Sequence, residues 1–325
     1  IKILKELHFP NSVGLLYSAF TFYLGFKVNS GEYKLMGLAP YGNENSVETK
    51  KFIKKIEENI VDIKKDGSIF LNQSYFKYTF GLKMINEKKF ENLFGLPTRN
   101  PNDEVTQTHC NMALAIQKVT EDIILKIVYE AKRLTKSENL CLAGGVALNC
   151  VANGKIEEKE IFKNIYIQPA AGDAGGSLGA ALAVYHMYYN KSRTINEYYD
   201  KMHGAYLGPF FSEKEIMIMN KKFKANYSRY ESMSHLTEHT AKLIVEGNVV
   251  GWFQDRSEFG PRALGNRSIL ADPRDENMQK KLNLKIKYRE GFRPFAPSVM
   301  EEDYNKFFEG NSPNPYMLLV KNVKS

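Results

Sequence analysis

Apolar residues recur with helical spacing in two parts of the chain. An aromatic-rich stretch predicts a helix over 12–25. A second, longer helix is predicted from Thr108, because apolar residues there return every three or four positions and share one face. These positions are Met112, Ala115, Ile116, Val119, Ile123, Ile127 and Val128.

Short apolar runs bounded by glycines predict strands between the helices. Residues 139–149 indicate a buried strand, a glycine turn and a helix start, and 165–169 indicate another strand. Residues 170–184 then read as a glycine loop that enters a helix of small residues. A second unit is predicted to begin near Tyr206, with a helix over 236–246 and a strand over 249–253. Strands that alternate with helices predict an α/β fold.

Three segments lack a clear period. Residues 31–42 hold glycines and a proline, which predicts a loop that turns tightly around another group. Residues 45–100 are rich in Lys and Glu around an aromatic patch, and we expect a peripheral insertion. Residues 187–205 are polar and tyrosine-rich, as expected of a linker between domains.

Composition is that of an ordinary globular protein, and 325 residues suffice for two domains. The formal net charge of +8 admits nucleic acid or phosphorylated small molecules as partners. Cys110, Cys141 and Cys150 form no Cys-x-x-Cys pair, which favours structural buried thiols over disulfides or a zinc site. No apolar run is long enough for a membrane span and no signal peptide is evident, so we expect a cytoplasmic location.

Cations concentrate in residues 251–297, among glycines, prolines and aromatic rings. Guanidinium groups bind phosphate or carboxylate through paired hydrogen bonds, and a stiff backbone lowers the cost of ordering them. An anion-binding site is therefore a better interpretation than a solvated basic loop. The cations are Arg256, Arg262, Arg267, Arg274, Lys287, Arg289 and Arg293.

Two glycine turns, Gly144-Gly145 and Gly172 to Gly176, each follow a strand and precede a helix. Amides at such helix starts favour anions, and the missing side chains let a nucleotide approach. Each turn could equally be a packing device, and neither fits the dinucleotide or P-loop pattern. Asn149 and Asn153 nearby could cap a helix or bind ribose and phosphate. We favour a nucleotide site.

Asp173 lies in the second glycine loop, where it could cap the helix or hold a divalent metal beside a phosphate. One carboxylate does not make a metal site. The pair His235 and His239 shares a helix face but has no third ligand evident, so we interpret both as surface residues. His109, at a helix start, is interpreted as a cap or surface group. No Ser/His/Asp or Cys/His arrangement is present, which disfavours covalent catalysis.

Three stretches together resemble the O-carbamoyltransferases, a family that includes nodulation-factor and antibiotic carbamoyltransferases. They are 142–154 (LAGGVALNCVANG), 168–182 (QPAAGDAGGSLGAAL) and 260–297, in the family's order. The 31–42 segment fits as well. The resemblance covers nearly the whole chain.

The resemblance implies two domains. Residues 1–200 would be an actin-like ATPase domain similar to the transferase that makes threonylcarbamoyl-adenosine in tRNA, and 201–325 a YrdC-like α/β domain. Carbamoyl phosphate and ATP would form carbamoyl-adenylate in the second domain, and the first would pass the carbamoyl group to a substrate hydroxyl, with iron (Fe²⁺) or another divalent metal bound nearby. Mg²⁺ is a further candidate.

The resemblance also assigns roles to residues. Arg262, Lys287 and Arg293 match positions that bind carbamoyl phosphate and nucleotide, and Asp173 matches a metal ligand. Positions of the nucleotide cradle are matched by Gly144, Gly145, Asn149 and Gly175. We add further candidates for carbamoyl phosphate or nucleotide binding: Arg256, Arg267, Arg289, Val146, Asn153, Gly172, Gly176 and Lys34.

Family features expected before Ile1 and after Ser325 are missing, including a histidine cluster that carries the other metal ligands. We therefore expect a chain cut at both ends, one that cannot complete the metal site and can lack activity by itself. The expected partners are carbamoyl phosphate, ATP and a small hydroxylated acceptor, without membrane or nucleic acid. The acceptor and any homo-oligomer are left open. The alternatives are tRNA modification, which the basic charge favours, and a non-catalytic nucleotide-binding module.

Overall fold

The computed structural model describes residues 2–194, 200–310 and 313–324. Contacts group the chain into unit 1, Ile1–Ile167 with Leu318–Lys321, and unit 2, Gln168–Met317 with Asn322–Ser325. This grouping does not test the predicted domain boundary at residue 200, which stays a prediction. Part of the predicted linker, 195–199, lies outside the described residues.

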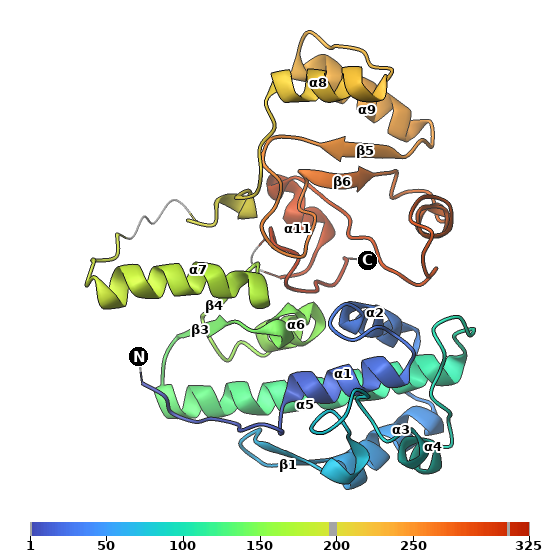
Figure 1. Ribbon diagram of the computed structural model, residues 1–325, viewed down its shortest axis with the longest axis vertical. Coiled ribbons are helices and arrows are strands. Elements are labelled where there is room, and N and C mark those ends of the chain that lie inside the picture. Colours follow the sequence, from blue (N-terminus) through green and yellow to red (C-terminus); the bar gives the residue numbers. More distant parts are fainter. Residues whose placement is uncertain (1, 195–199, 311–312, 325) are drawn as a thin grey trace. The chain divides into compact units, whose positions relative to one another are not determined.

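Unit 1 combines helices with two pairs of strands (Figure 1). Its helices are α1 (Val13–Tyr23), α2 (Glu32–Leu38), α3 (Val47–Lys55), α4 (Glu87–Phe94), α5 (Gln107–Thr135) and α6 (Cys150–Glu158). Its strands are β1 (Val61–Ile63), β2 (Ile69–Leu71), β3 (Asn139–Leu142) and β4 (Asn164–Ile167). β1 pairs antiparallel with β2, and β3 pairs parallel with β4.

Both helices predicted from apolar spacing are confirmed. The hydroxyl of Ser12 caps α1 by accepting a hydrogen bond from the Leu15 amide at 3.2 Å. Helix α5 starts one residue before Thr108, and the amide of Thr106 donates to His109 Nδ1 at 3.0 Å, so His109 is a cap, as predicted. α1 lies along α5 in Figure 1, and this pairing forms part of the core.

Residues 45–100 belong to the core of unit 1, so the prediction of a peripheral insertion is wrong. Phe90 is fully buried, and its ring lies 5.5 Å from that of Phe20 and 5.1 Å from that of Tyr23 on α1. Ile56 and Ile69 are also fully buried. The Lys and Glu residues that suggested a peripheral segment occupy the outer face of amphipathic elements, whose other face is apolar.

The predicted loop over 31–42 contains helix α2, which corrects that prediction. Glu32 orders its start, because its carboxylate accepts hydrogen bonds from the Ser18 hydroxyl at 2.7 Å and the Asn29 amide at 3.0 Å. Close approach occurs at Gly42, where a Cβ would lie 2.7 Å from the Cys110 carbonyl oxygen. Lys34 lies on α2 and is half-buried.

Strand β3, helix α6 and strand β4 form a β–α–β unit with parallel strands, which agrees with the predicted α/β class. The three cysteines are free, as predicted, and Cys110 is buried. Cys141 is exposed, contrary to the prediction of buried thiols. Side chains alternate along a strand, and Cys141 points to the face of β3 that the described residues leave uncovered.

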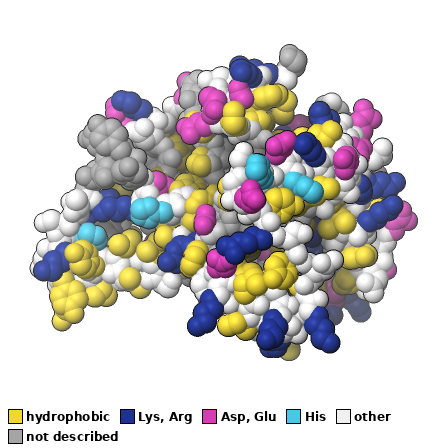
Figure 2. All heavy atoms as spheres, turned by 90° about the horizontal axis from the view of Figure 1, so that it is seen from above, with side chains coloured by type: hydrophobic (Ala, Val, Ile, Leu, Met, Phe, Trp, Pro, Cys, Tyr) yellow, Lys and Arg dark blue, Asp and Glu magenta, His cyan; other side chains and the backbone are white. Residues whose placement is uncertain are grey.

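Unit 2 contains α7 (Asp173–Ala183), α8 (Glu213–Phe223), α9 (Met233–Val245), α10 (Met278–Lys281), α11 (Tyr304–Phe307) and the antiparallel pair β5 (Val250–Phe253) and β6 (Arg267–Leu270). The predicted helix and strand over 236–253 are confirmed as α9 and β5. Hydrophobic side chains gather at the left edge of Figure 2, where α7 lies. None of the residues of α7 is buried. Among the described residues, no helix combines the length and apolar character that crossing a membrane requires.

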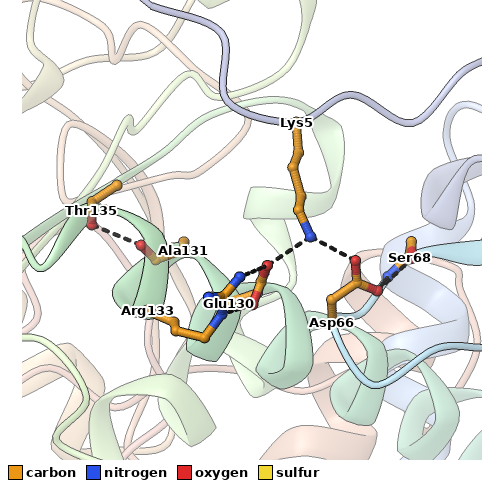
Figure 3. Close-up of polar contacts among 7 residues, drawn as sticks. All are labelled: Lys5, Asp66, Ser68, Glu130, Ala131, Arg133 and Thr135. Atoms are coloured by element: carbon orange, nitrogen blue, oxygen red, sulfur yellow. Dashed lines mark hydrogen bonds and ion pairs between the residues drawn. The ribbon is translucent and has the colours of Figure 1, made fainter.

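An ion-pair network joins the start of the chain to α5 and the β1–β2 turn (Figure 3). Lys5 Nζ lies 2.7 Å from Asp66 Oδ2 and 2.6 Å from Glu130 Oε1. Arg133 also donates to Glu130, at 2.7 and 2.8 Å. Hydrogen bonds from Arg133 and Lys5 hold the pKa of Glu130 at about 2, and those from Lys5 and Ser68 lower the pKa of Asp66.

We expect Phe90→Ala to reduce the free energy of unfolding by about 3–5 kcal/mol, because it empties a packed aromatic site. Urea denaturation measures this change. Phe80→Ala is the matched control, since Phe80 lies in the same segment but is 76% exposed, and its effect should be small. Equal effects of the two substitutions would contradict the assignment of this segment to the core.

We expect Lys5→Met to lower the thermal unfolding midpoint at pH 7 by roughly 1–3 °C. The partner carboxylates have lowered pKa values, so their stabilisation is complete above their unfolded pKa and is lost as the pH falls toward 2. The difference from wild type should therefore shrink on acidification and in high salt. Lys2→Met, in the same segment, is the control. A difference that stays constant between pH 7 and pH 3 would exclude this origin.

Candidate functional site

The first glycine turn, in unit 1, connects β3 to a 3₁₀ turn over Gly145–Leu148. Gly144 has φ +93°, a conformation that residues with a side chain rarely adopt. A Cβ at Gly144 or at Gly145 would meet no atom within 4 Å. The space next to both glycines is thus open, and a ligand needs such space to approach the backbone closely. The roles of Gly144, Gly145 and Val146 in nucleotide binding stay predictions.

Asn149 ends this turn and is held by α5. Its Nδ2 donates to Gln117 Oε1 at 3.1 Å, and Gln117 Nε2 donates to Asn149 Oδ1 at 3.2 Å. Asn149 Oδ1 also accepts from the Ala152 amide, which caps α6. Tyr17 and Glu121 complete the buried network by hydrogen bonds to Gln117 at 2.8 and 2.9 Å. Burial raises the pKa of both Tyr17 and Glu121.

Asn153 holds a distant part of the chain against α6. Its Nδ2 donates to the carbonyl oxygens of Ala147 at 2.8 Å and Leu318 at 2.9 Å, and its side chain is almost fully buried. The Val320 amide donates to the Cys150 carbonyl at 3.2 Å. A Cβ at Gly154 would lie 2.8 Å from the Val320 carbonyl oxygen, so this glycine admits the strap, residues 318–321. The structure thus gives Asn149 and Asn153 structural bonds, and a nucleotide role stays a prediction for both.

The second glycine turn, in unit 2, leads directly into α7. Gly172 is the N-cap and Asp173 the first helical residue, so Gly175 and Gly176 lie within the helix and not in a preceding loop. A Cβ at Gly175 would lie 2.2 Å from the Ala170 carbonyl oxygen, whereas one at Gly176 would meet no atom within 4 Å. Gly175 therefore has a packing role, and Gly176 faces open space.

Asp173 is exposed in the first turn of α7, where a carboxylate complements the helix dipole. Within residues 2–194, 200–310 and 313–324, no three His, Cys, Asp or Glu side chains gather closely enough to hold a metal ion. The described residues therefore do not form a complete iron site around Asp173. His235 and His239 are both exposed on α9, as predicted.

Glu258, in unit 2, lies beneath the loop that carries Arg262. One carboxylate oxygen of Glu258 accepts hydrogen bonds from the amides of Leu264, Asn266 and Arg267 at 2.7, 2.9 and 3.1 Å. The other accepts from Arg267 Nε at 2.8 Å. Burial favours a higher pKa for Glu258, but these bonds outweigh it and hold the pKa at about 2.

A buried asparagine organises the second cationic loop. Asn283 is fully buried, and its Nδ2 donates to the carbonyl oxygens of Gly291 at 3.1 Å and Arg293 at 2.8 Å. Its Oδ1 accepts from Arg289 Nε at 2.7 Å, and the Arg289 guanidinium lies 4.9 Å from the centre of the Phe295 ring. Lys287 is exposed at the start of this loop.

Predicted cations lie around each of these two buried side chains, Glu258 and Asn283. Around Glu258, Arg267 is bound to the carboxylate and Arg256 donates to the Gly208 carbonyl at 3.0 Å. Around Asn283 lie Arg289 and Arg293, and Arg293 Nη1 is 3.6 Å from Glu290. Arg274 pairs with Asp272 at 2.6 Å. Several guanidinium groups of this segment are thus bound to side chains or a carbonyl of the protein itself.

Sequence reasoning missed the buried polar residues that hold these loops, namely Gln117, Glu258 and Asn283. Glu258 had one available signal, because it is an acidic residue between Arg256 and Arg262 in a segment rich in cations. Gln117 lies on the buried face of a predicted helix, where a polar side chain needs a partner. Asn283 has no such signal, since nothing in its neighbourhood separates it from a surface asparagine.

Comparison with known proteins identifies the chain's relatives. The family model for the carbamoyltransferase N-terminus matches residues 1–182, and that for the carbamoyltransferase C-terminus matches 241–325. An uncharacterized protein of Synechocystis is 54% identical over 98% of this chain and 51% of its own length. Nodulation protein NolNO of Sinorhizobium fredii is 35% identical over 100% of the chain and 45% of its own length.

A named enzyme is also similar. The 3'-hydroxymethylcephem-O-carbamoyltransferase of Streptomyces clavuligerus is 30% identical over 69% of this chain and 40% of its own length. The chain thus spans about half the length, or less, of these relatives.

We expect Gly175→Ala to reduce the free energy of unfolding by about 1–3 kcal/mol, because the added methyl group meets a backbone carbonyl. Gly176→Ala, in the same helix turn, should leave stability unchanged or raise it by about 0.5–1 kcal/mol. Chemical denaturation of both variants measures the contrast. Equal destabilisation by the two would show that Gly175 has no special packing role.

Proposed function

Since the chain belongs to the carbamoyltransferase family, we propose that it activates carbamoyl phosphate with ATP and transfers the carbamoyl group to a hydroxyl of a small molecule. One observation carries the proposal. The N- and C-terminal family models match in order on one chain, and the second match includes the whole segment in which Arg262, Lys287 and Arg293 lie.

The proposed reaction balances with water as a co-reactant. Carbamoyl phosphate and water give carbamate and inorganic phosphate by cleavage of the P–O bond. A carbamate oxygen then attacks the α-phosphorus of ATP, which forms carbamoyl-adenylate and releases pyrophosphate. The acceptor hydroxyl attacks the carbamoyl carbon, AMP leaves, and the hydroxyl proton is released. The second of these steps, adenylation, brings two anions together.

Fixed cations suit the adenylation step, because it gathers the negative charges of carbamate and triphosphate. We assign Arg262, Lys287 and Arg293 to this role, with Arg256, Arg267 and Arg289 as supporting cations. The bonds to Glu258 and Asn283 support the assignment, since they hold the loops of Arg262 and Arg293 before any substrate arrives. In unit 1, the open turn at Gly144-Gly145 is assigned to the nucleotide of the transfer step.

The finer architecture is part of the proposal. We propose that residues 1–200 form an actin-like ATPase domain and that 201–325 form a YrdC-like domain. The parallel β3–α6–β4 unit is compatible with the first assignment. The proposed steps do not use iron, because the described residues around Asp173 do not provide a set of metal ligands.

The acceptor class rests on the relatives' names. One relative is named for O-carbamoylation of a hydroxymethylcephem, and another is named as a nodulation protein. Both names agree with a hydroxyl-bearing small-molecule acceptor in this chain, such as a sugar or an antibiotic-like compound. A tRNA acceptor would instead give a steep dependence of activity on salt concentration.

We expect the complete natural protein, once purified, to exchange labelled pyrophosphate into ATP. This exchange should require carbamoyl phosphate. Arg262→Ala and Lys287→Ala should each lower the exchange rate at least about 100-fold, because each removes a cation that faces transition-state charge. Lys242→Met, which removes an exposed cation of α9, is the control. Tight ATP binding without exchange would favour the non-catalytic module instead.

A further inference from the structure

The loop Phe259–Asn266, which we call the arginine loop, carries Arg262. Hydrogen bonds anchor it at both ends. At its start, the Phe259 amide donates to the Ala205 carbonyl oxygen at 2.6 Å. At its end, Asn266 Nδ2 donates to the Arg256 carbonyl oxygen at 2.8 Å. Gly260 and Gly265 have φ of +130° and +114°, so the path of this loop depends on glycine at both positions.

A single carboxylate fills the inside of the arginine loop. The side chain of Glu258 has no exposed surface, and three backbone amides point at one of its oxygens. Amides that leave water need hydrogen-bond partners, and Glu258 supplies the acceptor for those of Leu264 and Asn266. The conformation of the loop is therefore coupled to the charge and length of this side chain.

Tyr206 supports the same loop from outside. Its hydroxyl donates to the Leu264 carbonyl oxygen at 2.7 Å, so the Leu264 peptide is held on both its amide and its carbonyl side. This bond carries no net charge. Removing the Tyr206 hydroxyl therefore weakens the support of the loop without changing any charge.

We propose that Glu258 is a positioning residue that holds the arginine loop in the conformation in which Arg262 binds the phosphate of carbamoyl phosphate or ATP. The proposal deepens the proposed function and rests on it. A loop that is ordered before binding does not lose conformational freedom when the anion arrives, so the anion binds more tightly.

A positioning role and a purely electrostatic role of Glu258 predict opposite changes in anion affinity when its charge is removed. Glu258 is an anion close to a site for anions, so removal of its charge should tighten anion binding if only charge mattered. If the carboxylate shapes the loop, its removal should weaken binding although it removes a repulsion. Glu258→Gln separates the two because it keeps the size of the side chain.

The experiment measures the KM for carbamoyl phosphate and the kcat of pyrophosphate exchange. We expect Glu258→Gln to raise this KM about tenfold or more, which corresponds to about 1.4 kcal/mol. Glu213→Gln is the matched control, since it removes the same charge from an exposed pair with Arg229. Thermal unfolding above the assay temperature confirms that each variant is folded.

A double variant tests whether Glu258 acts through Arg262. In an Arg262→Ala background, Glu258→Gln should change the KM by less than about twofold, because the group that it positions is gone. A purely structural role would give the same tenfold change in both backgrounds and would overturn the inference. An unchanged or lower KM for Glu258→Gln alone would overturn it as well.

The outcomes separate this inference from the proposed function. If Arg262→Ala leaves exchange unaltered, the assignment of Arg262 fails and both fall. If Arg262→Ala lowers exchange as expected but Glu258→Gln has no effect, only the inference fails. Should Glu258→Gln not fold, Tyr206→Phe decides, with an expected rise in KM of roughly two- to fivefold. No rise in KM with Tyr206→Phe would then overturn the inference.

Discussion

Backbone amides and carbonyls that leave water must find hydrogen-bond partners, and this chain meets that requirement in its loops with single buried side chains. Glu258 collects three amides of the arginine loop, and Asn283 collects two carbonyls of the loop that ends at Arg293. Asn149 and Asn153 do the same around α6. In each candidate loop, one buried polar side chain therefore satisfies several backbone groups at once.

This constraint alters the meaning of the cation-rich segment. The sequence predicted that its arginines bind anionic ligands, yet Arg267 is bound to Glu258 and Arg274 to Asp272. Arg256 donates to a backbone carbonyl. The number of arginines in a sequence is thus a poor measure of the charge that a ligand meets. Under the proposed function, the geometry of the loop that presents Arg262 matters more for anion binding than the number of cations.

Elements with a strong period were predictable from sequence because burial repeats along them. Helices α1 and α5 and the β3–α6–β4 unit were located within a few residues. The segment 45–100 was misjudged because its many Lys and Glu residues hide an apolar face that includes Phe90. Helix α2 was taken for a loop because its glycines resemble turn signals, whereas Glu32 orders its start through local amides and the hydroxyl of Ser18 on α1. Side-chain partners of that kind, including Gln117 with Asn149, depend on tertiary contacts that no local pattern records.

The strap on α6 has a consequence for the order of synthesis. Unit 1 includes Leu318–Lys321, which a ribosome produces only after Gln168–Met317. Until then Asn153 lacks one of its two carbonyl partners, and the surface around Gly154 is uncovered. Domains generally fold in the order in which they are made. Here unit 1 is completed only after Gln168–Met317 has been made, so a nascent chain passes through a stage in which Asn153 and the surface around Gly154 await the strap.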